Sequence, residues 1–191
     1  MFKPMRRIQQ QLQDQEVDEI LEKHTYGVLS LFSEDGYPYG LPLNYVKEGD
    51  KLYFHVAKVG HKIDALHHYN KASFCVVDQD QAVPEELTTY YKSVIAFGKI
   101  SIIEDLETKY SVLDHFIARF NPQLNMQERK EAILPSFDRV ELIQFEIEHI
   151  TGKQAKKICF KTVKYPPSYK IHKKANPLSI NKCAFMDSLF K

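Results

Sequence analysis

Three basic side chains, Lys58, His61 and Lys62, lie within five residues where an apolar strand-like run gives way to a helix-like pattern. The first backbone N–H groups of a helix have no intrahelical acceptor, and the helix dipole is positive there, so a phosphate would be favoured. Cations oppose the same dipole and therefore need another reason to be present. A bound anion would supply that reason.

Two neighbouring residues suit the same hypothesis. Gly60 would allow a ligand to approach the backbone closely, and His55, near the end of the preceding run, could add a hydrogen-bond donor. A solvated loop of mixed charge explains residues 58–62 equally well. The residue types alone leave both alternatives open.

The stretch "LPLNY" contains two further candidates. Asn44 is polar among apolar neighbours, so if buried it must find hydrogen bonds, either from the edge of a ligand ring or from a neighbouring loop backbone. Pro42 cannot donate to a strand ladder, which predicts that it lies at a sheet edge or an irregularity.

Other site chemistries are disfavoured. The seven glycines cannot be arranged as GxGxxG or GxxxxGK[ST], which argues against Rossmann-type dinucleotide binding and Walker-type hydrolysis. HExxH and GxSxG are absent, and the spacing of His55, His61, His67 and His68 matches no standard zinc site. We therefore expect no metal centre, and nothing pairs Cys75 with a base.

Hydrophobic periodicity predicts the elements that would position these residues. Strands are expected at 26–33, 39–46, 52–56, 72–78, 94–103 and 140–150, and helices at 15–23, 62–70, 126–133 and from Asp105 to the Asn121-Pro122 stop. The first three strands would form a meander, and a polar loop would join the fourth to the fifth. Asp14 is the expected N-cap of the helix at 15–23. Lys109 is the expected surface lysine of the helix that begins at Asp105.

This order favours a mainly β, α+β fold: a closed or partly closed antiparallel barrel with flanking helices. In the last strand, Val140 and Leu142 give way to Ile143 and Phe145. That change of parity predicts a bulge or burial on both faces.

The 191 residues divide at residue 154 by charge. Residues 1–154 hold 17 Lys+Arg against 24 Asp+Glu, a net −7, whereas residues 155–191 hold nine Lys against Asp187, a net +8. We interpret 1–154 as the folded domain and 155–191 as a basic extension, solvated or partly docked; nucleic-acid binding by it is disfavoured.

No apolar run approaches bilayer length and the N-terminus lacks the pattern of a signal peptide, so no membrane partner and a cytoplasmic location are expected. The three cysteines, Cys75, Cys159 and Cys183, are odd in number and show no CxxC spacing. We interpret them as reduced thiols.

Four segments in order, "GYPYGLPLNY", "LYFHVAKVGHKID", "YYKSVIAFGKI" and "EIEHITGK", carry a family resemblance. Over about residues 5–157 the chain resembles the pyridoxamine 5′-phosphate oxidase-like FMN-binding split-barrel superfamily, and within it the nitroimidazole-resistance-type flavoproteins. The resemblance implies a six-stranded split β-barrel that dimerises with itself and holds FMN in a cleft between subunits.

The same resemblance implies a cofactor site. Residues that would line the isoalloxazine are Pro42, Leu43, Asn44 and Tyr45, and residues that would hold the phosphate are His55, Val56, Lys58, Gly60, His61 and Lys62, with Lys62 as the main charge partner. Tyr39 and His55 could lie near the ring, but no catalytic residue is assigned.

Two positions depart from related sequences, which commonly carry Ser in place of Val56 and Arg in place of His61. The chain thereby lacks a hydroxyl donor and a permanently charged, bidentate cation. Histidine is only partly charged near neutral pH, so weak or pH-sensitive FMN binding is expected.

The leading functional hypothesis is a flavin-dependent oxidoreductase that passes electrons from NADH or NADPH to a small aromatic or nitro-aromatic acceptor, with FMN, or FAD, as cofactor. The alternatives are a flavin store or sensor without turnover, and a haem-binding relative of the same barrel that would use residues such as His67 and His68.

Overall fold

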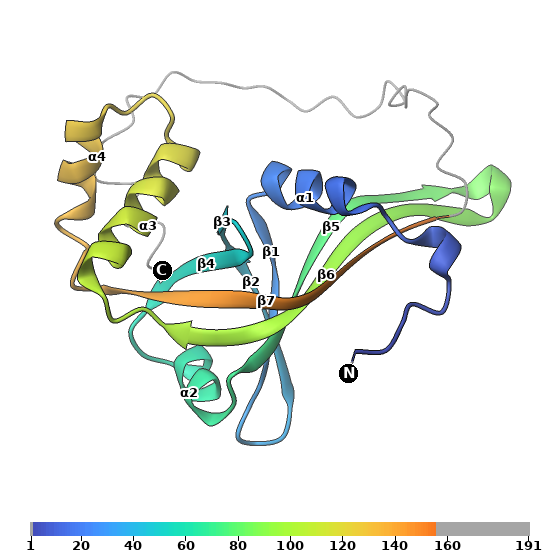
Figure 1. The fold of residues 1–191 in the computed structure, drawn as a ribbon, viewed down its shortest axis with the longest axis horizontal. Coiled ribbons are helices and arrows are strands. Elements are labelled where there is room, and N and C mark those ends of the chain that lie inside the picture. The colour runs from blue at the N-terminus through green and yellow to red at the C-terminus, as the bar shows by residue number, and fades with distance from the viewer. Residues whose placement is uncertain (1, 156–191) are drawn as a thin grey trace.

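Seven antiparallel strands form one strongly curved sheet in the computed structural model, which describes residues 2–155 (Figure 1). The strands are β1 Tyr26–Phe32, β2 Pro38–Asn44, β3 Val46–Glu48, β4 Lys51–Ala57, β5 Lys71–Val83, β6 Thr88–Ile102 and β7 Val140–Gln154. The α-helices are α1 Asp14–Lys23, α2 His61–His68, α3 Leu106–Phe120 and α4 Met126–Ile133, and short 3₁₀ helices span Ile8–Gln10 and Pro84–Glu86. The predicted antiparallel α+β class is confirmed.

The strand count is seven rather than six because Tyr45 interrupts the predicted strand 39–46. The sheet order is β2-β1-β5-β6-β7-β4-β3, so β2 and β3 are opposite edges although only Tyr45 separates them in the chain. The predicted three-strand meander is therefore wrong, since β2 pairs with β1 alone. Consecutive residues occupy opposite edges only if the sheet curls until its edges approach, which is the geometry of a split barrel.

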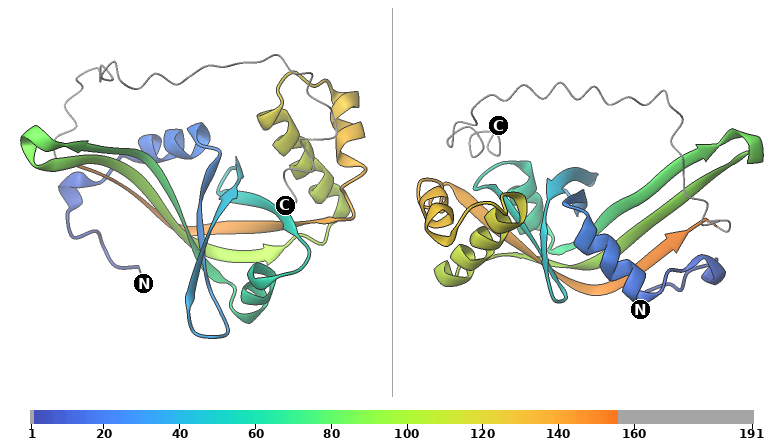
Figure 2. Two further views of the ribbon diagram at one scale, coloured as in Figure 1. Left: turned by 180° about the vertical axis from the view of Figure 1, so that it is seen from behind. Right: turned by 90° about the horizontal axis from the view of Figure 1, so that it is seen from above.

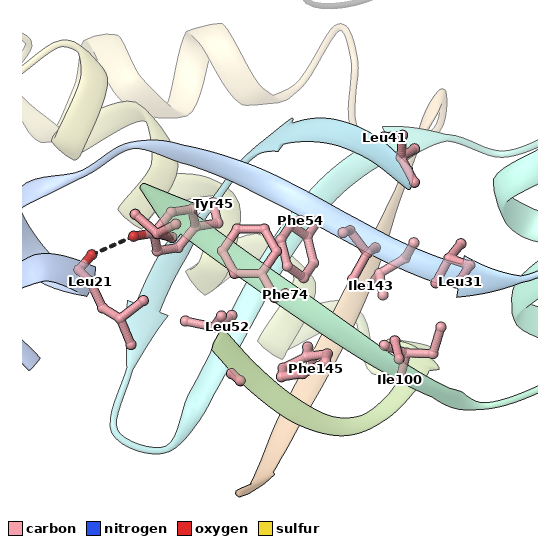
Figure 3. Packing of buried hydrophobic residues seen from close by; sticks show 14 of the residues in the cluster. Leu21, Leu31, Leu41, Tyr45, Leu52, Phe54, Phe74, Ile100, Ile143 and Phe145 are labelled. Carbon is pink, nitrogen blue, oxygen red and sulfur yellow. Dashed lines mark hydrogen bonds between the residues drawn. The ribbon is translucent and has the colours of Figure 1, made fainter. Parts of the chain in front are cut away.

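Tyr45 is fully buried, and its backbone N–H donates to the Thr25 carbonyl (3.0 Å). Its hydroxyl donates to the Leu21 carbonyl at 2.7 Å, and its ring packs edge-on against Phe74 inside the barrel (Figure 3). Burial raises the pKa of the Tyr45 phenol above its ordinary value. These contacts turn the chain inward between the two edge strands.

Local capping explains where two helices begin. Gln13, not Asp14, is the N-cap of α1: its backbone N–H donates to the Glu16 carboxylate at 3.1 Å, and Asp14 becomes the first helical residue, where its charge suits the dipole. The Asp105 carboxylate caps α3 by accepting from the Thr108 backbone N–H at 2.7 Å. The predicted bounds of α4 agree with the structure.

Two apolar clusters lie on opposite faces of β4 and β7. One fills the barrel and includes Phe54, Ile143 and Phe145 (Figure 3), and the other lies under α3 and α4 and includes Leu142 and Phe116. Burial on both faces of β7, predicted from the parity change, is confirmed. A register shift lies further along, where Phe97 pairs with residue 149 and the next residue of β6 pairs with residue 147.

The predicted loop between the fourth and fifth strands is part of a long hairpin, which extends away from the rest of the sheet (Figure 2). We call residues 79–93 the hairpin arm. Its residues are largely polar and do not alternate regularly between polar and apolar, because both faces of the ribbon meet solvent. Periodicity therefore gives no strand signal.

At the base of the hairpin arm, Asp78 accepts from Lys23 Nζ (2.7 Å) and His24 Nε2 (2.8 Å). Burial alone would raise the pKa of Asp78, but these hydrogen bonds hold it below its usual value.

The predicted basic extension, residues 155–191, lies outside the described residues except for Ala155, whose N–H donates to the Tyr91 carbonyl (2.9 Å). Among residues 2–155, no helix is both long and apolar enough to span a bilayer.

Candidate functional site

The N-terminus of α2 is the predicted anion position, and the helix begins there at His61. Gly60 precedes it with φ 109° and ψ 173°, a conformation that is essentially restricted to glycine. Its carbonyl accepts from the backbone N–H groups of Ile63 (2.8 Å) and Asp64 (3.3 Å). Within residues 2–155 the N–H groups of His61 and Lys62 have no acceptor, so two donors remain available to a ligand.

The two lysines of this segment are also free of ion pairs to any other described residue. Lys58 is exposed and Lys62 is half-buried beside the first turn of α2. Most partly buried cations elsewhere in the described chain have a carboxylate partner, as Lys47 has in Asp18 (3.3 Å). An unpaired, half-buried lysine on the same helical turn as free N–H groups is a suitable partner for a phosphate.

His61 is held by two contacts that the sequence did not indicate. Its Nε2 lies 2.8 Å from the hydroxyl of Ser33, and its ring stacks on Tyr39 with centroids 4.2 Å apart and planes inclined by 16°. Ser33 follows β1 and Tyr39 lies on β2, so the β1–β2 hairpin supports the start of α2. Helical and strand periodicity carry no signal for a contact across 28 residues.

His55 and Val56 do not present their side chains to the same place. Val56 is only 5% exposed and belongs to the barrel core. His55 points to the opposite face of β4, where its ring packs edge-on against Phe116 of α3, 4.7 Å between centroids. Burial lowers the pKa of His55 to about 4, so the imidazole is neutral at pH 7. Of the six predicted phosphate residues, Lys58, Gly60, His61 and Lys62 are gathered at the surface.

The predicted ring-lining segment lies on the edge strand β2. Pro42 is exposed there, which confirms its predicted edge position, and Leu43 packs partly against the barrel core. The Asn44 amide donates to the Thr25 carbonyl at 3.1 Å, the second of the two alternatives considered for it. Because Tyr45 is buried, this segment can offer a ligand Pro42, the edge of Leu43 and backbone groups.

An apolar surface borders that segment. The outward side chains of β1, β5 and β6 stay exposed in residues 2–155, and we call them the open face: Tyr26, Val28, Val77, Ile95 and Phe97. Small outward residues, Ser30 and Cys75, lie among them, and burial raises the pKa of the Cys75 thiol. Pro42 pairs with Val28, so the ring-lining segment and the open face adjoin.

A family model described as pyridoxamine 5′-phosphate oxidase matches residues 13–154 of the chain. The chain belongs to this family. The match covers every strand of the sheet and all four α-helices but not the basic extension. The matched region therefore contains both the start of α2 and the open face. No curated protein sequence gives a significant match.

Solved structures share the family fold. A candidate 5-nitroimidazole antibiotic resistance protein from Bacteroides thetaiotaomicron has a TM-score of 0.65 and 22% identity, covering 75% of this chain and 86% of that one. A conserved hypothetical protein from Mycobacterium tuberculosis has a TM-score of 0.72 and 15% identity, covering 86% and 99%. An FAD and haem binding protein from Mycobacterium smegmatis has a TM-score of 0.63 and 22% identity, covering 78% and 74%. At these identities the likeness establishes the fold.

Proposed function

We propose that this protein binds a flavin, FMN in the first instance, with the phosphate at the N-terminus of α2. The observation that carries the proposal is the unpaired, half-buried Lys62 beside the free backbone N–H groups of residues 61 and 62. Two free amides and an unpaired ammonium suit a phosphate monoester better than a neutral ligand. The solved relatives support the class of ligand, because one of them is described as an FAD and haem binding protein.

Each part of the site has a role in this proposal. Lys62 and Lys58 supply positive charge to the phosphate. Gly60 carries no side chain, and the space that a Cβ would occupy there is open, so a ligand can approach the backbone at the entrance to α2. Pro42 and Leu43 offer an apolar edge to a planar ring. Bound flavin would supply the redox chemistry.

The active form in this proposal is a homodimer joined through the open face. Val28, Ile95 and Phe97 are 42%, 39% and 39% exposed, and adjacent apolar side chains of this size are typical of an interface. Because Pro42 adjoins Val28, a second copy on the open face would also border the ring-lining segment. The flavin would then lie between the two subunits.

We further propose that the loaded dimer passes electrons from NADH or NADPH to a small aromatic or nitro-aromatic acceptor. The description of one solved relative as a candidate 5-nitroimidazole antibiotic resistance protein supports this class of acceptor. No side chain of the chain needs to act as an acid or a base. The residues instead bind and orient the flavin and the acceptor, and they exclude water from the site.

The absorption spectrum of the purified protein, before and after FMN is added, tests flavin binding. We expect a perturbed flavin spectrum and a rise in the melting temperature that grows with FMN concentration. Lys62→Ala should weaken FMN binding about tenfold, or ~1.4 kcal/mol, whereas the exposed α4 substitution Lys130→Ala should not. Equal affinities of the two variants would place the phosphate elsewhere, and no spectral or thermal response to FMN would refute the proposed function.

Turnover is tested separately from binding. Flavin-loaded protein should oxidise NADH or NADPH faster when a nitro-aromatic acceptor is present. Tight flavin binding without stimulated oxidation would leave a flavin store or sensor as the function.

Haem binding is the second candidate, because the Mycobacterium smegmatis relative is described as binding both FAD and haem. His67 and His68 are exposed at the end of α2 and could reach an iron. A Soret band after haem addition that is lost in the His67→Ala/His68→Ala double variant would support this candidate.

A further inference from the structure

Ser33 is a buried polar residue beside the start of α2, where the phosphate of the proposed flavin would bind. Ser33 is 1% exposed, its backbone N–H donates to the Tyr37 carbonyl (3.1 Å), and its own carbonyl accepts from Gly36 (3.0 Å). The side-chain oxygen has one partner among residues 2–155, Nε2 of His61 at 2.8 Å. The position of one proton therefore decides how both side chains are satisfied.

Two arrangements fit a hydroxyl and a neutral imidazole at this distance. If Nε2 carries the ring proton and donates to Ser33, the hydroxyl proton of Ser33 has no acceptor at a site that water does not reach. A buried donor without an acceptor is costly. If Ser33 donates to Nε2, the hydroxyl is satisfied, and the ring proton must then lie on Nδ1.

Tyr39 fixes the plane in which that proton lies. The stacked Tyr39 ring, 4.2 Å from the His61 ring, restricts rotation of the imidazole about its Cβ–Cγ bond. Nε2 is the ring nitrogen remote from the backbone and faces Ser33, whereas Nδ1 is bonded to Cγ and stays close to the main chain. Nδ1 makes no hydrogen bond within residues 2–155, and His61 is the exposed first residue of α2, so a proton on Nδ1 is available to a ligand at this helix start.

We propose that Ser33, with Tyr39, holds His61 as the Nδ1–H tautomer and so makes Nδ1 a directed hydrogen-bond donor for the flavin phosphate. This inference rests on the proposed function for the identity of the ligand. His61 then contributes a directed N–H, and Lys58 and Lys62 supply positive charge to the site. Ser33 is a positioning residue, because it acts on the phosphate only through His61.

Nitrogen NMR of protein labelled with ¹⁵N-histidine tests the tautomer without any flavin. The His61 signals, assigned by their absence from His61→Asn, should show the ring proton on Nδ1 in the unliganded wild type. Ser33→Ala should abolish this preference, and Ser33→Thr, which keeps the hydroxyl, should retain it. A wild-type signal with the proton on Nε2 would overturn the inference even if FMN binds tightly.

Two isosteric substitutions of the exposed His61 test the donor function. The amide nitrogen of Asn can occupy the place of Nδ1, and that of Gln the place of Nε2. His61→Asn should keep FMN affinity within about threefold of wild type, and His61→Gln should lose about tenfold, the contribution of one hydrogen bond to a charged acceptor. Equal losses in the two variants would overturn the assignment of the donor to Nδ1.

Riboflavin, which lacks the phosphate, is the ligand control. Its affinity should be unchanged in His61→Asn, His61→Gln and Ser33→Ala, since the donor serves only the phosphate. A parallel loss of riboflavin affinity would indicate a general structural effect and overturn the inference. Failure of wild-type protein to bind FMN would instead refute the proposed function, while the NMR experiment would still report on the tautomer.

Discussion

One sheet carries two apolar outer surfaces, one covered by helices and one exposed in the described part of the chain. On β4 and β7, side chains such as Tyr53 and Leu142 pack under α3 and α4 and are almost completely buried. On β1, β5 and β6, no helix lies over the open face in the described part of the chain (Figures 1 and 2). Val28 and Ile95 of this face stay exposed. The chain covers one surface with its own helices and leaves the other exposed within residues 2–155, where the proposed second copy would bind.

The comparison also separates two histidines of the predicted phosphate set. His55 belongs to the helix-covered side, where its Nδ1 has no partner among the described residues and burial lowers its pKa to about 4. His61 lies at the start of α2, where it is exposed and hydrogen-bonded to Ser33. The helix-covered side therefore buries its histidine, whereas the start of α2 leaves His61 accessible, as the proposed ligand site requires.

The largest expected effect is on the helix-covered side. Phe116→Ala removes a ring that is 5% exposed and lies between α3 and His55, so the free energy of unfolding should fall by about 3–5 kcal/mol. Denaturant unfolding measures the loss. The control, Leu134→Ala, is 59% exposed and should change stability by no more than about 0.5 kcal/mol. A loss below ~1.5 kcal/mol for Phe116→Ala would mean that α3 and α4 are only loosely attached.

On the open face, Ile95→Lys should act on association more than on folding. A charge buried between two copies without a partner should weaken dimerisation at least ~30-fold, about 2 kcal/mol, and lower FMN affinity with it. Sedimentation velocity measures the dimer. Ser101→Lys, an exposed position of the same strand outside the open face, is the control. An Ile95→Lys protein that stays dimeric would place the interface elsewhere.

His55 gives the helix-covered side a pH dependence. Its folded pKa of about 4 lies below the unfolded value of ~6.5, so the unfolded chain binds more protons between these values and stability falls as pH falls through this window. From pH 7 to pH 5 the wild type should lose about 2 kcal/mol more than His55→Leu does. Denaturant unfolding at both pH values measures the difference.

The matched control for His55 is the exposed His67. His67→Leu should keep the pH dependence of the wild type, because the His67 side chain is exposed in the folded chain. Identical pH profiles for wild type and His55→Leu would show that water reaches His55.

Much of the fold followed from local patterns. Apolar runs bounded by turn residues predicted β1 and β4, and three- and four-residue spacing predicted α3. The break at Tyr45 was not predictable, because it depends on hydrogen bonds to Thr25 and Leu21, both about 20 residues away in the chain. The hairpin arm was missed because polar strands exposed on both faces lack the alternation that marks a half-buried strand.

The site was predictable where it depends on local chemistry. Gly60, His61 and Lys62 follow from the strand-to-helix junction, whereas the Ser33–His61 contact is tertiary and leaves no mark on the sequence. One available signal was overlooked: in "LYFHV", Val56 shares parity with the apolar Leu52 and Phe54, which predicts that it faces the core while His55 faces away.

Lys109 shows the limit of helical periodicity. Its place on α3 predicted a surface lysine, but it is 5% exposed, donates to the Val140 carbonyl at 2.7 Å and lies over the Phe137 ring at 4.9 Å. A lysine satisfied by backbone and ring contacts cannot be told from an exposed one by spacing.

The smallest expected effect concerns Phe2, whose ring stacks on His149 at 4.5 Å and lies 5.7 Å from Phe97 at the margin of the open face. Phe2 is 43% exposed, so Phe2→Ala should lower the free energy of unfolding by only about 0.5–1 kcal/mol and leave dimerisation unchanged. Ile8→Ala, 63% exposed in the same N-terminal segment, should change neither quantity. A loss above ~2 kcal/mol for Phe2→Ala would mean that the N-terminal segment is itself the cover of the open face, and the contrast with the helix-covered side would then disappear.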